Sequence, residues 1–212
     1  MQRTVATSFD LFGTLVSADR PAEPATAVAD ALRERDVTVP ADWATAYREP
    51  QFDAPTGAEH SLATHVAAAL ESRNVDASKS AVDAATLDAF DRPVSVRDAA
   101  RDAVDAARQN GPVAVLSNCS VPGLVERTLD RADLAGEFDA VVTSVDCGWR
   151  KPHERAFEAV ADALDVSAES LVHVGDDSEA DGGVEAVGGR ALLLDYAELA
   201  AIADQLEARA WD

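Results

Sequence analysis

The chain has 212 residues, with 39 acidic residues against 18 basic ones and a formal net charge of −21. Because a surface this negative repels phosphate backbones and anionic lipid headgroups, we expect neither a nucleic-acid partner nor a membrane partner. Hydrophobic residues make up 47% of the chain, which is enough for a packed core, so the acidity does not indicate disorder.

The basic residues are almost all arginine, and the two lysines are Lys79 and Lys151. Few lysines, many aspartates and an alanine-rich apolar set favour a halophilic source, where hydrated carboxylates keep a protein soluble in salt. An acidic protein from an organism with a GC-rich genome is the alternative. Cys119 and Cys147 make no disulfide framework, and Met1–Phe9 lacks a signal-peptide pattern, so we expect a cytoplasmic protein.

The first predicted element is a strand at Thr4–Phe9, a short run of apolar and β-branched residues. From about Ser17 to Pro93 no good strand follows, and apolar residues recur at helical spacing between prolines. These helical patterns are Ala25–Leu32, Leu62–Leu70 and Val82–Phe90. We interpret the segment as a helical insertion that leaves the carboxyl end of the first strand and covers the ligand site there.

Strands and helices alternate after the insertion. The predicted strands are Val113–Leu116, Phe138–Val142, Leu171–Val174 and Ala191–Leu194, and helical patterns cover 99–107, 124–129, 157–164 and 199–206. This alternation is typical of parallel βαβ units with helices on both faces of the sheet. The predicted fold class is therefore α/β, with a parallel sheet and an inserted helical domain.

Polar residues follow the predicted strands where each one ends. They are Asp10 after the first strand, Ser117 and Asn118 after the second, Lys151 after the third, and Asp176, Asp177 and Asp181 after the fourth. Each has an ordinary alternative as a turn or helix-cap residue. Their occurrence in order at successive strand ends favours a common site, because the carboxyl ends of parallel strands share one edge of the sheet.

The residue types in this set indicate chemistry on an anionic group. Asp10 can serve as a nucleophile or a metal ligand. The acidic side chains after the fourth strand suit a hard cation such as Mg²⁺, which would also relieve their mutual repulsion. Ser117 and Lys151 can hold a phosphate or a carboxylate.

The order and spacing of these residues resemble the haloacid dehalogenase-like hydrolase superfamily, from Asp10 to about Gly189. The matching motifs are Phe9–Leu15, Val115–Asn118, Lys151–Pro152 and Val174–Asp177 with Asp181. The resemblance implies a Rossmann-like catalytic core at residues 1–16 and 94–212 with a helical cap at 17–93. It implies a small-molecule substrate, and the pattern predicts no particular oligomeric state.

The resemblance also implies a role for each residue. Asp10 would be the nucleophile that forms a covalent aspartyl intermediate, and Thr14 would form hydrogen bonds around it. Ser117, Asn118 and Lys151 would bind the transferring group, and Lys151 would also steady the charge of the nucleophile. The implied Mg²⁺ ligands are Asp10, the backbone carbonyl of Phe12, Asp176, and Asp177 or Asp181.

One residue departs from the pattern of the superfamily's phosphatases. Those enzymes have a second aspartate, the general acid and base, where this chain has Phe12. We therefore expect a Mg²⁺-dependent phosphatase of a small phosphorylated metabolite that is slow on poor leaving groups. An aromatic residue here resembles the metal-independent 2-haloacid dehalogenases, for which Arg48 would be the candidate carboxylate-binding residue. The other alternative is a ligand-binding protein without catalysis.

Overall fold

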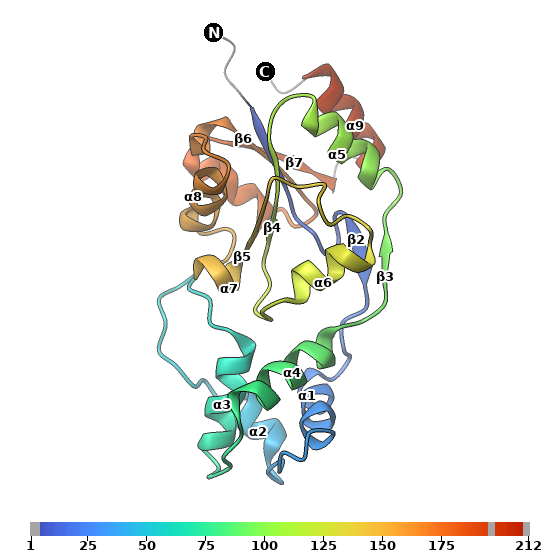
Figure 1. The fold of residues 1–212 in the computed structure, drawn as a ribbon. Helices are drawn as coiled ribbons and strands as arrows, with labels where there is room; N and C mark the ends of the chain where they lie inside the picture. Colours follow the sequence, from blue (N-terminus) through green and yellow to red (C-terminus); the bar gives the residue numbers. More distant parts are fainter. Residues whose placement is uncertain (1–4, 195–197, 210–212) are drawn as a thin grey trace.

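A computed structural model describes residues 5–194 and 198–209. Within those ranges the main sheet has five strands in the order β5-β4-β1-β6-β7, and every neighbouring pair is parallel (Figure 1). The strands are β1 (Ala6–Phe9), β4 (Val113–Ser117), β5 (Ala140–Thr143), β6 (Leu171–Gly175) and β7 (Arg190–Leu193). The predicted α/β fold class is confirmed, and Thr4 of the first predicted strand lies outside the described residues.

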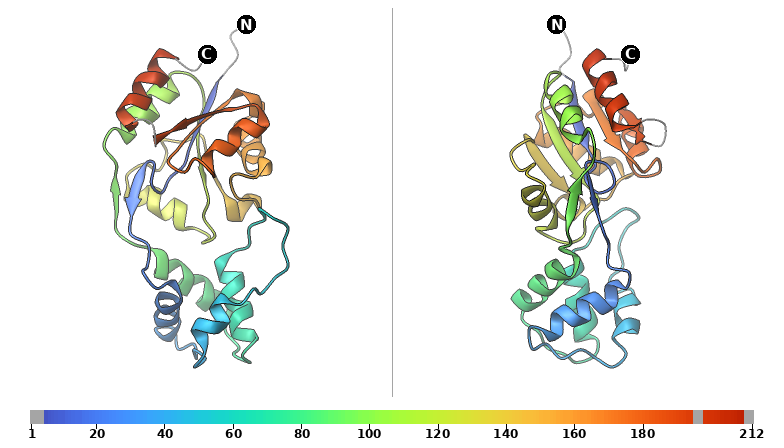
Figure 2. Two further views of the ribbon diagram at one scale, coloured as in Figure 1. Left: turned by 180° about the vertical axis from the view of Figure 1, so that it is seen from behind. Right: turned by 90° about the vertical axis from the view of Figure 1, so that its right-hand side faces the viewer.

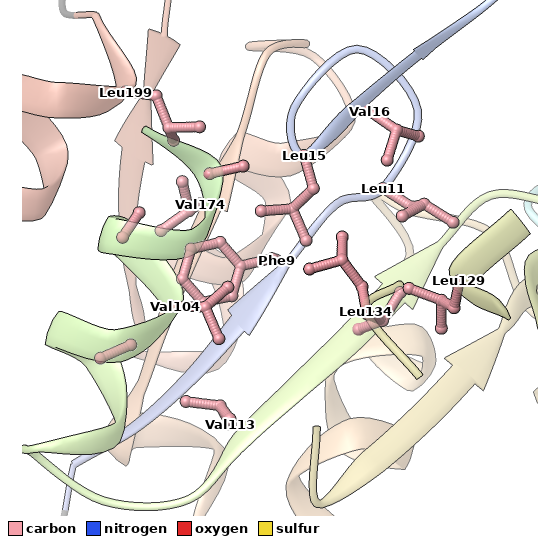
Figure 3. Close-up of a cluster of buried hydrophobic side chains, with 14 of the residues drawn as sticks. Phe9, Leu11, Leu15, Val16, Val104, Val113, Leu129, Leu134, Val174 and Leu199 are labelled. Atoms are coloured by element: carbon pink, nitrogen blue, oxygen red, sulfur yellow. The ribbon is translucent and has the colours of Figure 1, made fainter. Parts of the chain in front are cut away.

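Helices cover both faces of the sheet, as the continuous apolar strands predict. On one face α5 (Ala100–Arg108), α6 (Leu124–Arg131) and α9 (Leu199–Ala208) share a core with alternate strand residues such as Val113 and Val115. Figure 3 shows Phe9 of β1 in that core, beside Val104 of α5 and Val174 of β6. On the other face α8 (Glu154–Ala163) packs on the opposite strand residues. Packing of helices on both faces fixes the positions of the strand ends, which carry the predicted site residues.

Four helices lie beyond the carboxyl end of the sheet (Figures 1 and 2). They are α1 (Pro24–Arg33), α2 (Trp43–Arg48), α3 (Leu62–Glu71) and α4 (Lys79–Phe90), and we call them the helical segment. Ser61 and Ser78 cap α3 and α4 by accepting hydrogen bonds from backbone amides three residues later. The helical segment has a hydrophobic cluster of its own, in which Leu32, Val66 and Leu70 are buried.

Several short elements were not predicted. Strands β2 (Val16–Ala18) and β3 (Val94–Val96) form an antiparallel pair where the chain leaves and re-enters the sheet region, so the expectation of no strand from Ser17 is wrong at its start. Helices α2 and α7 (Ser144–Cys147) and the 3-10 turns 168–170 and 181–187 also lacked a signal. These elements are too short to show a period. The division at 16/17 and 93/94 stays a prediction.

A loop before α3 attaches the helical segment to the sheet region a third time. Ala58 forms an antiparallel bridge with Trp149, and the Glu59 amide donates to the Gly148 carbonyl at 2.9 Å. The Glu59 carboxylate pairs with Arg150 at 2.7 Å. These contacts hold the helical segment over the strand ends. In the described part of the chain, no helix is long and apolar enough to span a membrane.

Candidate active site

The carboxyl ends of β1, β4 and β6 and the loop before α8 meet at one small cavity of about 130 Å³. Its lining includes most of the predicted site residues, namely Asp10, Phe12, Ser117, Asn118, Lys151, Asp176, Asp177 and Asp181. The cavity lies where the strand order reverses around β1. Asp10 directly follows β1 and Asp176 directly follows β6, and these two strands are hydrogen-bonded neighbours. The parallel topology therefore brings the predicted residues together.

Lys151 is buried and joins two carboxylates. Its Nζ donates to Asp10 Oδ1 at 2.9 Å and to Asp181 Oδ1 at 2.6 Å. The amide side chain of Asn118 fixes the Lys151 backbone, because it donates to the carbonyl at 3.0 Å and accepts from the amide at 2.8 Å. Asn118, which was predicted to bind substrate, lines the cavity, and its amide group holds the lysine in place.

A buried histidine extends this network below the cavity. His173 Nε2 lies 3.0 Å from Asp181 Oδ1, and its Nδ1 lies 2.8 Å from Ser8 Oγ. Burial, and then the charge of Lys151, lower the pKa of His173 to about 4, so we assign a neutral ring that donates to Asp181 and accepts from Ser8. The ring packs edge-on against Phe157, and nothing in the spacing of the sequence indicates its hydrogen bonds.

The carboxylates of Asp181 and Asp177 are both engaged by other groups of the protein. Burial raises the pKa of Asp181, but the His173 hydrogen bond and the Lys151 charge outweigh burial and hold that pKa below its usual range. Asp181 Oδ2 also accepts from the Asp177 amide at 2.9 Å. Asp177 Oδ1 accepts from the Glu179 and Ala180 amides, which makes it the cap of a turn. Both predicted metal ligands thus have structural partners, and Asp181 positions Lys151.

Asp176 faces the loop that follows Asp10. Thr14 Oγ1 donates to Asp176 Oδ1 at 2.9 Å, so Thr14 orients this carboxylate. Gly13 has a φ of +98°, and a Cβ there would collide with the Asp176 carboxylate. Glycine is required at this position both for the backbone conformation and for the close approach of Asp176.

Burial is the main influence on the ionisation of Asp10. Burial, opposed by Lys151 and reinforced by Asp181 and Asp176, raises the pKa of Asp10 from 3.8 to about 6. Phe12 also lines this cavity, and within the described residues no hydrogen bond is made to its carbonyl oxygen. The Asp10 and Asp176 carboxylates with that carbonyl are the ligand types that a hard cation takes.

A second cavity of about 450 Å³ lies between the helical segment and the strand ends. Phe12, Arg20 and Asn118 line both cavities, so the two adjoin. Arg48 is exposed on α2 and is not among the residues that line either cavity. Sequence reasoning missed Arg20, because a lone arginine before the first predicted helix carries no pattern.

The chain is similar in sequence to a known family and to a named phosphatase. A sequence model of the haloacid dehalogenase-like hydrolases matches residues 6–182. Phosphatase MT3486 of Mycobacterium tuberculosis is 37% identical over 97 residues, which cover 45% of each chain. The match therefore spans less than half the length of this relative.

Two solved structures share the fold. YfnB of Bacillus subtilis, bound to magnesium, is 19% identical with a TM-score of 0.52, and the match covers 91% of this chain and 87% of that one. A dehalogenase in an intermediate complex is 18% identical with a TM-score of 0.53, and the match covers 92% of this chain and 86% of that one. At this identity the likeness concerns the fold.

Proposed function

Because this chain belongs to the haloacid dehalogenase-like hydrolase family, we propose that this hydrolase is a phosphatase of a small phosphorylated metabolite. The observation that carries the proposal is Asp10, whose carboxylate is fixed by Lys151 in a cavity with Asp176 beside it. The partial match to a named phosphatase supports the same reaction class. In this proposal residues 17–93 act as a cap over the site.

The contacts assign a part to each side chain. Lys151 holds Asp10 Oδ1, so we assign Oδ2 as the atom that attacks phosphorus. The aspartyl phosphate forms as the bond between phosphorus and the ester oxygen breaks, and the alcohol leaves as its oxyanion. The lysine charge then stabilises the extra negative charge as the phosphoryl group transfers. Ser117 lies in the same cavity and its hydroxyl can donate to a phosphoryl oxygen. Water then releases phosphate and restores Asp10.

The donor set of the site fits Mg²⁺. No group of three or more histidine, cysteine or acidic side chains in the described ranges forms a ready metal cage. Mg²⁺ is usually held by one or two carboxylates together with water and substrate phosphate, which is what Asp10 and Asp176 offer with the Phe12 carbonyl. When bound, the cation would neutralise phosphate charge and offset the burial and the neighbouring carboxylates, which together raise the pKa of Asp10.

Phe12 limits the proposed chemistry. It lines both cavities, and it stands two residues after Asp10, where the resemblance implies the general acid and base of the phosphatases. A phenyl ring is neither an acid nor a base, and general acid–base help contributes roughly 10²–10⁴ in rate. We therefore expect good leaving groups to react and the aspartyl phosphate to break down slowly.

A 2-haloacid dehalogenase is the second candidate, and Phe12 favours it because a halide leaves without a proton. That reaction needs no cation, however, and Lys151 pairs with Asp10 and Asp181 but not with Asp176, whose carboxylate also lines the cavity. Arg48, the residue expected to bind the haloacid carboxylate, lies away from both cavities. The phosphatase is therefore the stronger proposal.

The test measures phosphate release from 4-nitrophenyl phosphate during a Mg²⁺ titration after chelation. We expect release that requires Mg²⁺ and is lost in Asp10→Asn, with the exposed Asp204→Asn on α9 as a matched control of unchanged activity. Turnover that persists in chelator would contradict the proposal. Chelator-resistant halide release from 2-chloropropionate would establish the dehalogenase instead.

A further inference from the structure

Arg20 is an exposed arginine that lines both cavities. Most arginines in the described ranges form ion pairs, among them Arg33, Arg35, Arg73, Arg101, Arg108, Arg127, Arg131 and Arg150. Within residues 5–194 and 198–209, Arg20 has no ion pair and no hydrogen bond, although Asp19 is its neighbour in the chain. An unpaired guanidinium in a chain of net charge −21 is available to an external anion.

The position of Arg20 connects it to the proposed substrate. Arg20 lines the small cavity with Asp10 and Lys151, and it also lines the larger cavity. Lys151 and Ser117 line the same small cavity and are the groups proposed above to hold the transferring phosphoryl group. Arg20 is thus placed where it can reach the part of a substrate that extends from the small cavity into the large one.

The larger cavity has a mostly apolar wall. Tyr47, Leu62 and Phe90 contribute from the helical segment, and Val121 and Leu124 contribute from the other side. Its volume of about 450 Å³ is in the range of sites for small organic molecules. Arg150 also lines it, but its guanidinium is already paired with Glu59. An apolar body therefore fits this cavity. Asp19 lines it as well, and Arg20 is the lining cation without an ion pair in the described residues.

From these observations we infer that Arg20 is a specificity-determining residue, and that the substrate is a phosphate monoester with an apolar body and a second anionic group that pairs with Arg20. This inference rests on the proposed phosphatase function. A guanidinium binds a carboxylate or a phosphate through two parallel hydrogen bonds, which gives both affinity and orientation.

The test compares phenyl phosphate with its 3-carboxy and 4-carboxy derivatives. Each derivative adds one carboxylate, and the two differ in the distance between that carboxylate and the phosphate. The kcat/KM values are measured for the wild type and Arg20→Met. Arg92→Met, which changes an exposed arginine outside both cavities, is the matched control. We expect the wild type to prefer a carboxylated phosphate. In Arg20→Met we expect kcat/KM for that carboxylated phosphate to fall by about tenfold or more through a higher KM, while kcat/KM for phenyl phosphate is unchanged. Arg92→Met should behave like the wild type on all three substrates.

Two kinetic results would overturn the inference. One is a wild type that shows no preference for either carboxylated phosphate. The other is an Arg20→Met variant that is slowed equally on all three substrates, because Arg20 would then serve the transferring phosphoryl group.

Binding separates this inference from the reaction itself. Calorimetry with phenylphosphonate and 4-carboxyphenylphosphonate, which are not hydrolysed, should show tighter binding of the carboxylated ligand, lost in Arg20→Met. If no phosphate ester turns over, the proposed function fails, but this comparison still decides the anion site. Equal affinities of the wild type for the two phosphonates would overturn it.

Discussion

Replacing Asp10 with asparagine should stabilise the protein in the presence of a chelator. Burial and the neighbouring Asp181 and Asp176 raise the pKa of Asp10 from 3.8 to about 6, against the opposing charge of Lys151. The folded protein therefore binds a proton more tightly than the unfolded chain at this site. The resulting loss of unfolding free energy is absent below about pH 4, grows as the pH rises, and is complete above about pH 6.

The size of the stability gain expected for Asp10→Asn follows from the raised pKa of Asp10. A difference of roughly two pKa units corresponds to about 3 kcal/mol of unfolding free energy at neutral pH. An asparagine side chain would keep the shape of the aspartate, and Lys151 would keep its pair with Asp181. Because each kcal/mol moves the Tm of a chain this size by about 2–4 °C, Asp10→Asn should raise the Tm by several degrees.

Thermal unfolding in chelator at about pH 7.5 and about pH 4 checks this prediction. The gain for Asp10→Asn should be large at the higher pH and nearly vanish at the lower one. Asp204→Asn removes one exposed charge and controls for the net charge of −21; it should change stability by less than about 0.5 kcal/mol. A gain that does not depend on pH, or a loss of stability at about pH 7.5, would refute the electrostatic argument.

Three further outcomes follow from the same site. Phe12→Asp should speed the hydrolysis of alkyl phosphates by at least about tenfold, because general acid–base catalysis contributes roughly 10²–10⁴ in rate. Steady-state assays measure this rate, and an unchanged rate would show that proton transfer is not limiting. Lys151→Met should lower kcat by about 10²-fold or more in a variant that circular dichroism shows to be folded. Asp176→Asn should lose the rise in Tm that Mg²⁺ gives the wild type, and an undiminished rise would place the cation elsewhere.

The fold was predictable where the chain has a clear period. The strands around Phe9, Val113 and Leu171 are buried apolar runs, and their alternation with amphipathic helices fixes a parallel sheet. The β2–β3 pair and α2 were missed because three to six residues define no period. Their formation depends on contacts between segments far apart in the chain.

The site was predictable as a set of residues but not as a set of partners. Parallel topology brings Asp10, Lys151 and Asp176 to one edge whatever their contacts are. Spacing does not reveal that Asp181 is held by Lys151 and a neutral His173. It also cannot show that Arg20 is left without a partner among the described residues, because that depends on where every other acidic side chain lies.

The central claim is that Asp10 becomes covalently attached to phosphorus. Phe12 should make breakdown of this intermediate slow, so it should accumulate during hydrolysis of 4-nitrophenyl phosphate. Rapid acid quenching, digestion and mass spectrometry should locate a phosphoryl group on Asp10 in the wild type and none in Asp10→Asn. A phosphoryl group on another residue, or an enzyme that turns over without any being trapped, would contradict the account.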